Sequence, residues 1–97
     1  MRAAKIDRNQ PEIVKAMRAL GVSVQHLHSV GAGCPDLLCA IEGVNFLVEV
    51  KDGSKAPSAQ KLTPDQVEWH SAWRAAVHIV RDVQQAIAVV ETVRGAK

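Results

Sequence analysis

The 97-residue chain predicts a single α/β domain in which helices cover a mixed β-sheet, with elements in the order α-β-β-β-α-β-α. Three observations predict this class. Some stretches carry apolar residues at helical spacing between recognisable helix ends, and short apolar or alternating runs typical of strands lie between them. The length suits one domain, because two fragments would be too small to bury cores. Residues 1–97 are therefore treated as one domain.

Residues 1–9 are interpreted as a polar arm and residues 10–20 as the first helix. Pro11 suits the first turn of a helix, where its missing N–H is harmless, and Gly21 is typical of the residue that follows a helix. The apolar residues between them recur at helical spacing: Ile13, Val14, Met17 and Leu20.

Three strands are predicted next, over residues 22–28, 36–41 and 46–51. The first two are separated by the loop Gly31–Pro35, where two glycines and a proline interrupt any ladder. The turn Glu42–Asn45 joins the second and third strands into a hairpin.

A flexible loop over residues 52–61 leads to a well-marked helix start. Thr63 as N-cap and Gln66 as the third helical residue form a capping box, which predicts a helix to about residue 76. Two elements complete the order: a strand over residues 77–80 and a helix over residues 83–93 that Asp82 caps.

Composition excludes several function classes. Lys and Arg total 12 against 10 acidic residues, so the net charge of +2 permits nucleic-acid binding but is smaller than that of proteins that only coat DNA. Aromatic residues are 3%, which argues against stacking platforms for single-stranded bases. No apolar run approaches the ~20 residues of a membrane helix, and no secretory signal is expected. Two cysteines, Cys34 and Cys39, are too few for a disulfide scaffold, so a cytoplasmic location is expected.

Asp36, Glu49 and Lys51 form the constellation that carries chemistry. Alternation along a strand places Glu49 and Lys51 on one face, about 7 Å apart. In the predicted hairpin, the start of one strand lies beside the end of the next, so Asp36 is expected beside both. The sequence therefore predicts two carboxylates next to one ammonium group.

This set of groups suits metal-assisted phosphodiester hydrolysis. Two neighbouring carboxylates repel unless a cation neutralises them, and oxygen donors suit Mg²⁺, for which we expect Mn²⁺ to substitute. A nearby lysine can orient or deprotonate a water and offset charge on the phosphate. An isolated Glu-x-Lys at a strand end is more often a solvated edge, but its combination with Pro-Asp at the start of the partner strand is rarer.

The stretches Gly33–Leu38 and Phe46–Lys51, GCPDLL and FLVEVK, resemble the PD-(D/E)xK nuclease superfamily. More narrowly, the chain is similar to the small stand-alone VRR-NUC type encoded by phages and prophages, relatives of Holliday-junction resolvases. The resemblance covers nearly the whole chain. Because the motif is degenerate, its specificity rests on order and spacing, which both fit. It implies a restriction-endonuclease-like core.

The resemblance also implies residue roles. Asp36 and Glu49 match the metal-binding carboxylates, the Val50 carbonyl a further ligand and Lys51 the catalytic lysine.

Two further matches have alternative interpretations. Glu12 matches an acidic residue that often faces the metal, but a solvent-exposed Glu favoured by the helix dipole fits equally well. Gln66 matches a catalytic-site glutamine that points at the site or the DNA, although its place in the capping box already accounts for it.

Other polar residues carry weaker signals. Lys55 and Lys61 are candidates for phosphate contacts that do not read sequence. Gly33 would let the backbone approach a phosphate, though a plain turn explains it equally well. His26 and His28 are interpreted as exposed strand residues rather than zinc ligands.

The aromatic and remaining histidine residues suggest no role in the site. For Trp69 and Trp73, core packing is favoured over a base wedge or dimer contact. His70 and His78 have no partner detectable in the sequence.

The expected function is a Mg²⁺- or Mn²⁺-dependent DNA endonuclease. The resemblance implies a 5′-phosphate product and action on branched DNA, above all Holliday junctions. Symmetric cleavage needs two sites, so a homodimer is expected. The alternatives are a flap or single-strand nuclease, a restriction-like nuclease, or a non-catalytic DNA-binding module with the same fold. The intact Asp36, Glu49 and Lys51 argue against the last.

Overall fold

The computed structural model describes residues 6–95, so the first five residues of the expected polar arm lie outside the described part. The predicted order of helices and strands is confirmed. The elements are α1 (Gln10–Ala19), β1 (Ser23–His26), β2 (Leu37–Ile41), β3 (Val44–Val50), α2 (Pro64–Ala72), β4 (Val77–Val80) and α3 (Val83–Gly95). A short 3₁₀ helix, Pro57–Gln60, lies in the loop that the sequence predicts to be flexible.

The four strands form one mixed sheet in the order β1-β2-β3-β4. Strand β2 runs antiparallel to both β1 and β3, and β4 runs parallel to β3. The β2–β3 hairpin turns at Glu42 and Gly43, whose φ angles are both positive at 48° and 84°. Such a two-residue turn matches the twist of the strands, so β3 begins two residues earlier than predicted.

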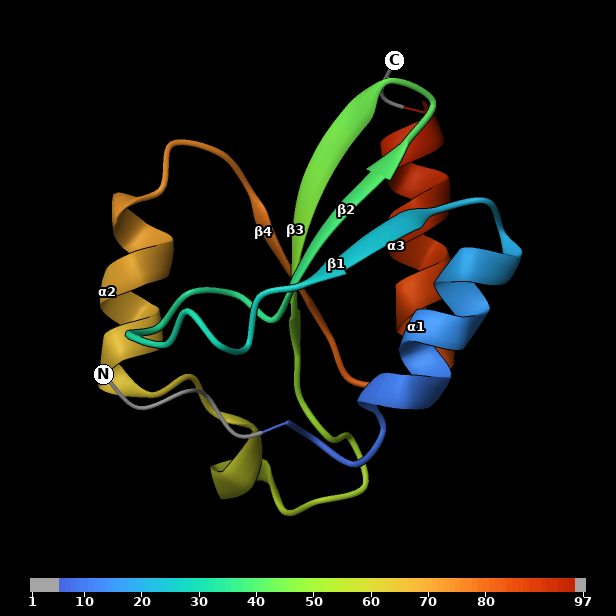
Figure 1. The fold of residues 1–97 in the computed structure, drawn as a ribbon. Coiled ribbons are helices and arrows are strands. Elements are labelled where there is room, and N and C mark those ends of the chain that lie inside the picture. The colour runs from blue at the N-terminus through green and yellow to red at the C-terminus, as the bar shows by residue number, and fades with distance from the viewer. Residues whose placement is uncertain (1–5, 96–97) are drawn as a thin grey trace.

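Helices α1 and α3 lie side by side on one face of the sheet, and α2 lies on the other side (Figure 1). The hydrophobic core fills the space between the sheet and helices α1 and α3. Helix α1 contributes Ile13, Val14 and Met17 to it, and α3 contributes Ala86, Val90 and Val93. From β3, the side chains of Phe46, Val48 and Val50 point into this core.

Helix α2 contains no buried residue. It ends at Ala72, four residues earlier than predicted, because Trp73 adopts an extended conformation as the chain crosses to β4. Core packing of the two tryptophans is not observed: Trp69 and Trp73 stack on each other with ring centroids 4.7 Å apart, and Trp73 keeps 49% of its surface exposed.

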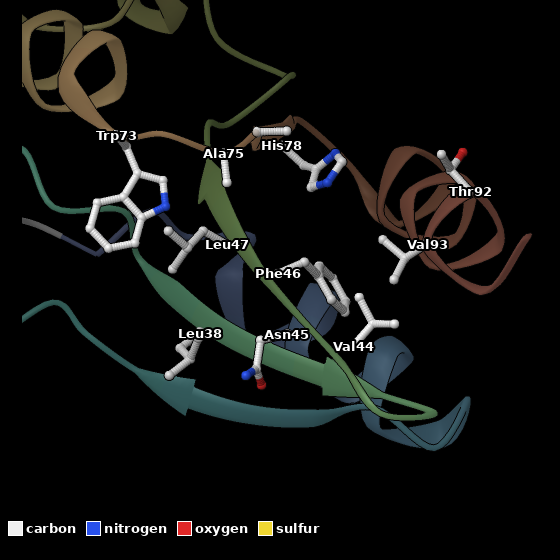
Figure 2. A pocket seen from close by; sticks show the side chains of 11 residues that line it. Leu38, Val44, Asn45, Phe46, Leu47, Trp73, Ala75, His78, Thr92 and Val93 are labelled. Carbon is white, nitrogen blue, oxygen red and sulfur yellow. The ribbon is translucent and has the colours of Figure 1, made fainter. Parts of the chain in front are cut away.

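An apolar hollow of about 540 Å³ lies beside Trp73. Figure 2 shows Trp73 with Leu47 and Leu38 on one part of its wall and Phe46 on another. Strand β4 pairs with β3 only from Leu47 onward, so residues 44–46 continue beyond the end of β4 at this hollow. Among residues 6–95, no helix has the length and apolar character needed to cross a bilayer.

Candidate active site

The β2–β3 register brings Asp36 and Glu49 together. Leu37 pairs with Val48, so the next position along the ladder sets Asp36 opposite Glu49. The Val50 N–H donates a hydrogen bond of 2.8 Å to Asp36 Oδ2, which fixes that carboxylate at the end of β3. Both side chains are buried, with 5% of Asp36 and 2% of Glu49 exposed. The two carboxyl groups therefore meet in a site that excludes most water.

Burial decides the electrostatics of this pair. It raises the pKa of Glu49 to about 9, and hydrogen bonding and repulsion from Asp36 act in the same direction. The Lys51 ammonium opposes the shift but does not cancel it. Burial and the neighbouring charge of Asp36 therefore make Glu49 hold its proton more tightly than an exposed carboxyl group does.

Gln66 connects helix α2 to Glu49 of β3 and to Lys51, which directly follows that strand. The Lys51 ammonium donates to Gln66 Oε1 at 2.8 Å, and Gln66 Nε2 donates to Glu49 Oε2 at 3.1 Å. The same Gln66 Oε1 accepts from the Thr63 N–H at 2.9 Å, and the Gln66 N–H donates to Thr63 Oγ1. The two interpretations of Gln66, as a capping-box residue and as a site residue, are thus both compatible with its contacts.

His70 reaches the site from one turn further along α2. Its Nε2 lies 3.6 Å from Glu49 Oε1, and only 13% of the His70 side chain is exposed. Both atoms are buried, and neither has a hydrogen-bond partner among the described residues. Burial lowers the pKa of His70, and the Lys51 charge adds to this. Sequence reasoning missed His70, although its spacing of four from Gln66 places both on one helix face.

A hollow of about 330 Å³ opens beside the carboxylates. Asp7 lines it together with the loop that contains Gly33 and with the start of α2. Burial raises the pKa of Asp7, and repulsion from Asp36 adds to the effect. The Lys55 ammonium lies 3.8 Å from Asp7 Oδ1 and is partly exposed. The sequence gives no signal for Asp7, because this residue belongs to the segment interpreted only as a polar arm.

The structure does not bring Glu12 to this hollow. Helix α1 turns Ile13 and Val14 into the core, and Glu12 is about 100° away around the helix, where it is exposed. It lines a separate surface depression with Arg81 and Asp82. Of the two interpretations of Glu12, the position agrees with the solvent-exposed one.

Gly33 is required by packing between the loop and α2. Its φ angle is +83°, and a Cβ at this position would collide with the backbone carbonyl of Asp65. Lys61, by contrast, is exposed and lines another depression, with Leu62 and Val67. The structure thus sets Gly33 in the wall of the hollow and Lys61 outside it.

Few side chains at the site could bind a metal ion. Within residues 6–95, no group of three or more His, Cys, Asp or Glu side chains is arranged to hold a metal ion. His26 and His28 contact each other edge to face, and Gln10 Nε2 lies 3.3 Å from His26 Nδ1. Two carboxylates beside an open hollow suit an ion that keeps several waters, as Mg²⁺ does, rather than zinc.

Comparison with known proteins gives one informative result. No protein-family profile and no curated protein matches the sequence. A solved structure described as a "VRR_NUC domain" superimposes with a TM-score of 0.66 and is 34% identical in sequence. The alignment covers 92% of this chain and 97% of that one, so the similarity extends over nearly the whole domain.

Proposed function

Because the chain belongs to the VRR_NUC family of nuclease-type domains, we propose that it is a Mg²⁺-dependent DNA endonuclease for which Mn²⁺ can substitute. The observation that carries this proposal is the buried pair Asp36 and Glu49, with Lys51 held beside it by Gln66. A folded domain does not need two adjacent buried carboxylates for its stability, since their repulsion destabilises the fold.

The residues present fit a hard divalent cation. Glu49 Oε1 is buried without a hydrogen-bond partner in the described part of the chain, which leaves a lone pair available. Mg²⁺ is commonly bound through one or two carboxylates plus substrate phosphates, and it keeps several waters. In this proposal Asp36 and Glu49 hold the ion, with the Val50 carbonyl as a further ligand. When bound, the ion supplies Lewis-acid activation of the phosphate and of water.

The remaining roles belong to this chain's own side chains. Lys51 places a positive charge where negative charge develops on the phosphate, and Gln66 fixes its position relative to Glu49. Lys55 and Lys61 are exposed cations on the segment after Lys51, and we propose that they contact the DNA backbone. Such contacts set affinity and salt dependence rather than sequence preference.

We propose branched DNA, and Holliday junctions in particular, as the substrate. A four-way junction is cut symmetrically only by two active sites, and residues 6–95 bring Asp36 and Glu49 together at one site in a body 32 Å long, no longer than about one turn of duplex. A second copy of the chain supplies the other site. Both cysteines are free, which agrees with a cytoplasmic location.

The apolar hollow beside Trp73 is the surface that we propose for the second copy. Half-exposed Trp73 and Leu38, 39% exposed, line it, and residues 44–46 of β3 extend there beyond β4 (Figure 2). Unpaired strand edges and exposed apolar groups favour association, and a twofold axis would use the same patch on both chains.

One cleavage assay tests the proposed activity. Labelled four-way junction, linear duplex and single strand are each incubated with Mg²⁺, Mn²⁺ or EDTA. We expect junction-selective, metal-dependent nicking that Asp36→Asn and Lys51→Ala abolish. The matched control is Glu12→Gln, which neutralises an exposed carboxylate outside the hollow and should cleave like the parent.

Each other outcome of this assay selects a different function. Equal cleavage of all three substrates indicates a general or restriction-like nuclease, and preference for the single strand indicates a flap or single-strand nuclease. Binding without cleavage in any metal indicates a non-catalytic module and overturns the proposal.

Sedimentation tests the second copy separately. The parent is expected at twice the chain mass, and Trp73→Asp is expected to give monomers. Val67→Asp is the matched control, since Val67 is 53% exposed on α2, the helix that Trp73 follows, but lines a different depression. A monomeric parent, or dissociation by both variants alike, contradicts this surface.

A further inference from the structure

We propose that His70 is a positioning residue that orients the Glu49 carboxylate for the divalent cation. This inference rests on the proposed function, because it concerns the same site. On helix α2, Gln66 and His70 are four residues apart and therefore share one face. Gln66 Nε2 contacts Glu49 Oε2 at 3.1 Å, and His70 Nε2 faces the other oxygen, Oε1, at 3.6 Å.

The distance between His70 and Glu49 exceeds a hydrogen bond, which is about 2.7–3.2 Å for N–H···O. Buried polar atoms are rarely left without partners. His70 Nε2 and Glu49 Oε1 are two such atoms, they face each other, and the described residues offer neither another partner. A small rotation of the carboxylate would convert this contact into a hydrogen bond from the ring N–H, which requires no charge on the imidazole.

Two donors on one helix would then hold the carboxylate from both of its oxygens. That arrangement leaves each Glu49 oxygen a lone pair for a cation but restricts rotation about the side chain. Restricting a ligand in this way raises metal affinity, and loss of such a supporting contact typically weakens metal binding about 10- to 100-fold. Trp69 packs edge to face on the imidazole and limits its movement in turn.

Mn²⁺ binding to the full-length chain, followed by electron paramagnetic resonance, tests the role without requiring cleavage. His70→Leu removes the donor at similar volume, and we expect it to weaken Mn²⁺ binding about 10-fold. His70→Gln returns an N–H donor at similar reach and should restore most of the affinity. His70→Asn carries the same amide on a side chain one methylene shorter, so it should bind as weakly as the leucine variant.

Matched controls separate positioning from folding. His78→Leu removes another half-buried imidazole, one that contacts Phe46 rather than the carboxylates, and should bind Mn²⁺ like the parent. Thermal unfolding in EDTA should be alike for the parent and the three His70 variants, because His70 lies outside the hydrophobic core. At saturating Mn²⁺, cleavage by His70→Leu should return to the parent rate.

Two results overturn the inference while the proposed function stands: parent-like Mn²⁺ affinity of His70→Leu, or glutamine binding no better than leucine. If His70→Leu does not fold, the comparison of glutamine with asparagine decides in the same way. Asp36→Asn tests the site itself and should lose Mn²⁺ binding. If it binds like the parent, the ion does not lie at the carboxylates, and both the function and the role of His70 fail.

Discussion

The two faces of the sheet in this molecule differ in almost every physical respect. The face toward α1 and α3 is closed by apolar side chains, and Val48 and Val50 of β3 are fully buried there. The face toward α2 carries Glu49 and, just after β3, Lys51, and the helix that lies over it buries none of its residues. Neighbouring residues of one strand thus serve opposite purposes.

The difference shows how a chain of this size separates stability from chemistry. Apolar burial between the sheet and two helices provides the main favourable free energy of folding. The other face can therefore tolerate two buried carboxylates whose mutual repulsion opposes folding. Side chains of β3 point alternately to the two faces of the sheet. The strand that contributes to the core therefore also fixes the position of Glu49.

The largest expected change in the free energy of unfolding comes from a substitution on the sheet face that α1 and α3 cover. Met17 is fully buried in the core, so Met17→Ala should lower the free energy of unfolding by about 2–5 kcal/mol. Val67→Ala, on exposed α2, should change it by no more than about 0.5 kcal/mol. Urea unfolding of both variants measures the contrast. Equal losses would mean that α2 contributes to the core as much as α1 does.

The next effect is expected at the carboxylate pair, and its main cause is the burial of Glu49. The pKa of Glu49 rises from 4.5 to about 9 on folding, so the folded state binds this proton more tightly than the unfolded state. Stability in EDTA should therefore fall as the pH rises through this range. Glu49→Gln removes the group and should flatten the dependence in urea unfolding at about pH 5 and about pH 9. If Glu49→Gln leaves the pH dependence of stability unchanged, the pKa of Glu49 is not raised in the folded state.

The smallest effect is expected at the start of α2. Thr63→Ala removes the N-cap and should destabilise this helix by about 1 kcal/mol. Because α2 lies outside the core, the loss should be local: α2 amides should exchange hydrogen about five-fold faster, with α1 amides unchanged. Hydrogen exchange measured by NMR distinguishes the two helices. Uniform acceleration would show that the two faces unfold as one unit.

The adjacency of Asp36 and Glu49 was predictable from the sequence. A hairpin with a tight turn has only one register that keeps Phe46 and Val48 in the core, and this register sets the carboxylates opposite each other. The order of the elements was equally predictable, since both the strands and the helix starts follow local patterns. The similarity to a VRR_NUC domain structure agrees with that order.

The contributions of α2 and the N-terminal segment were not predictable in the same way. An exposed helix has no apolar face to fix its rotation, so the pattern around His70 and Trp73 could not show which side faces the sheet. Asp7 reaches the hollow through a chain path that no periodicity records. The position of Glu12 depends on the rotation of α1, and the burial of Ile13 and Val14 turns it to solvent.

The most direct test of the central claim is a crystal of the protein soaked in Mn²⁺ and examined by anomalous diffraction. We expect one strong peak within about 2.0–2.4 Å of oxygens from both Asp36 and Glu49, and its loss in Glu49→Gln. A peak bound elsewhere, or none at the pair when Mn²⁺ supports cleavage in solution, would contradict it.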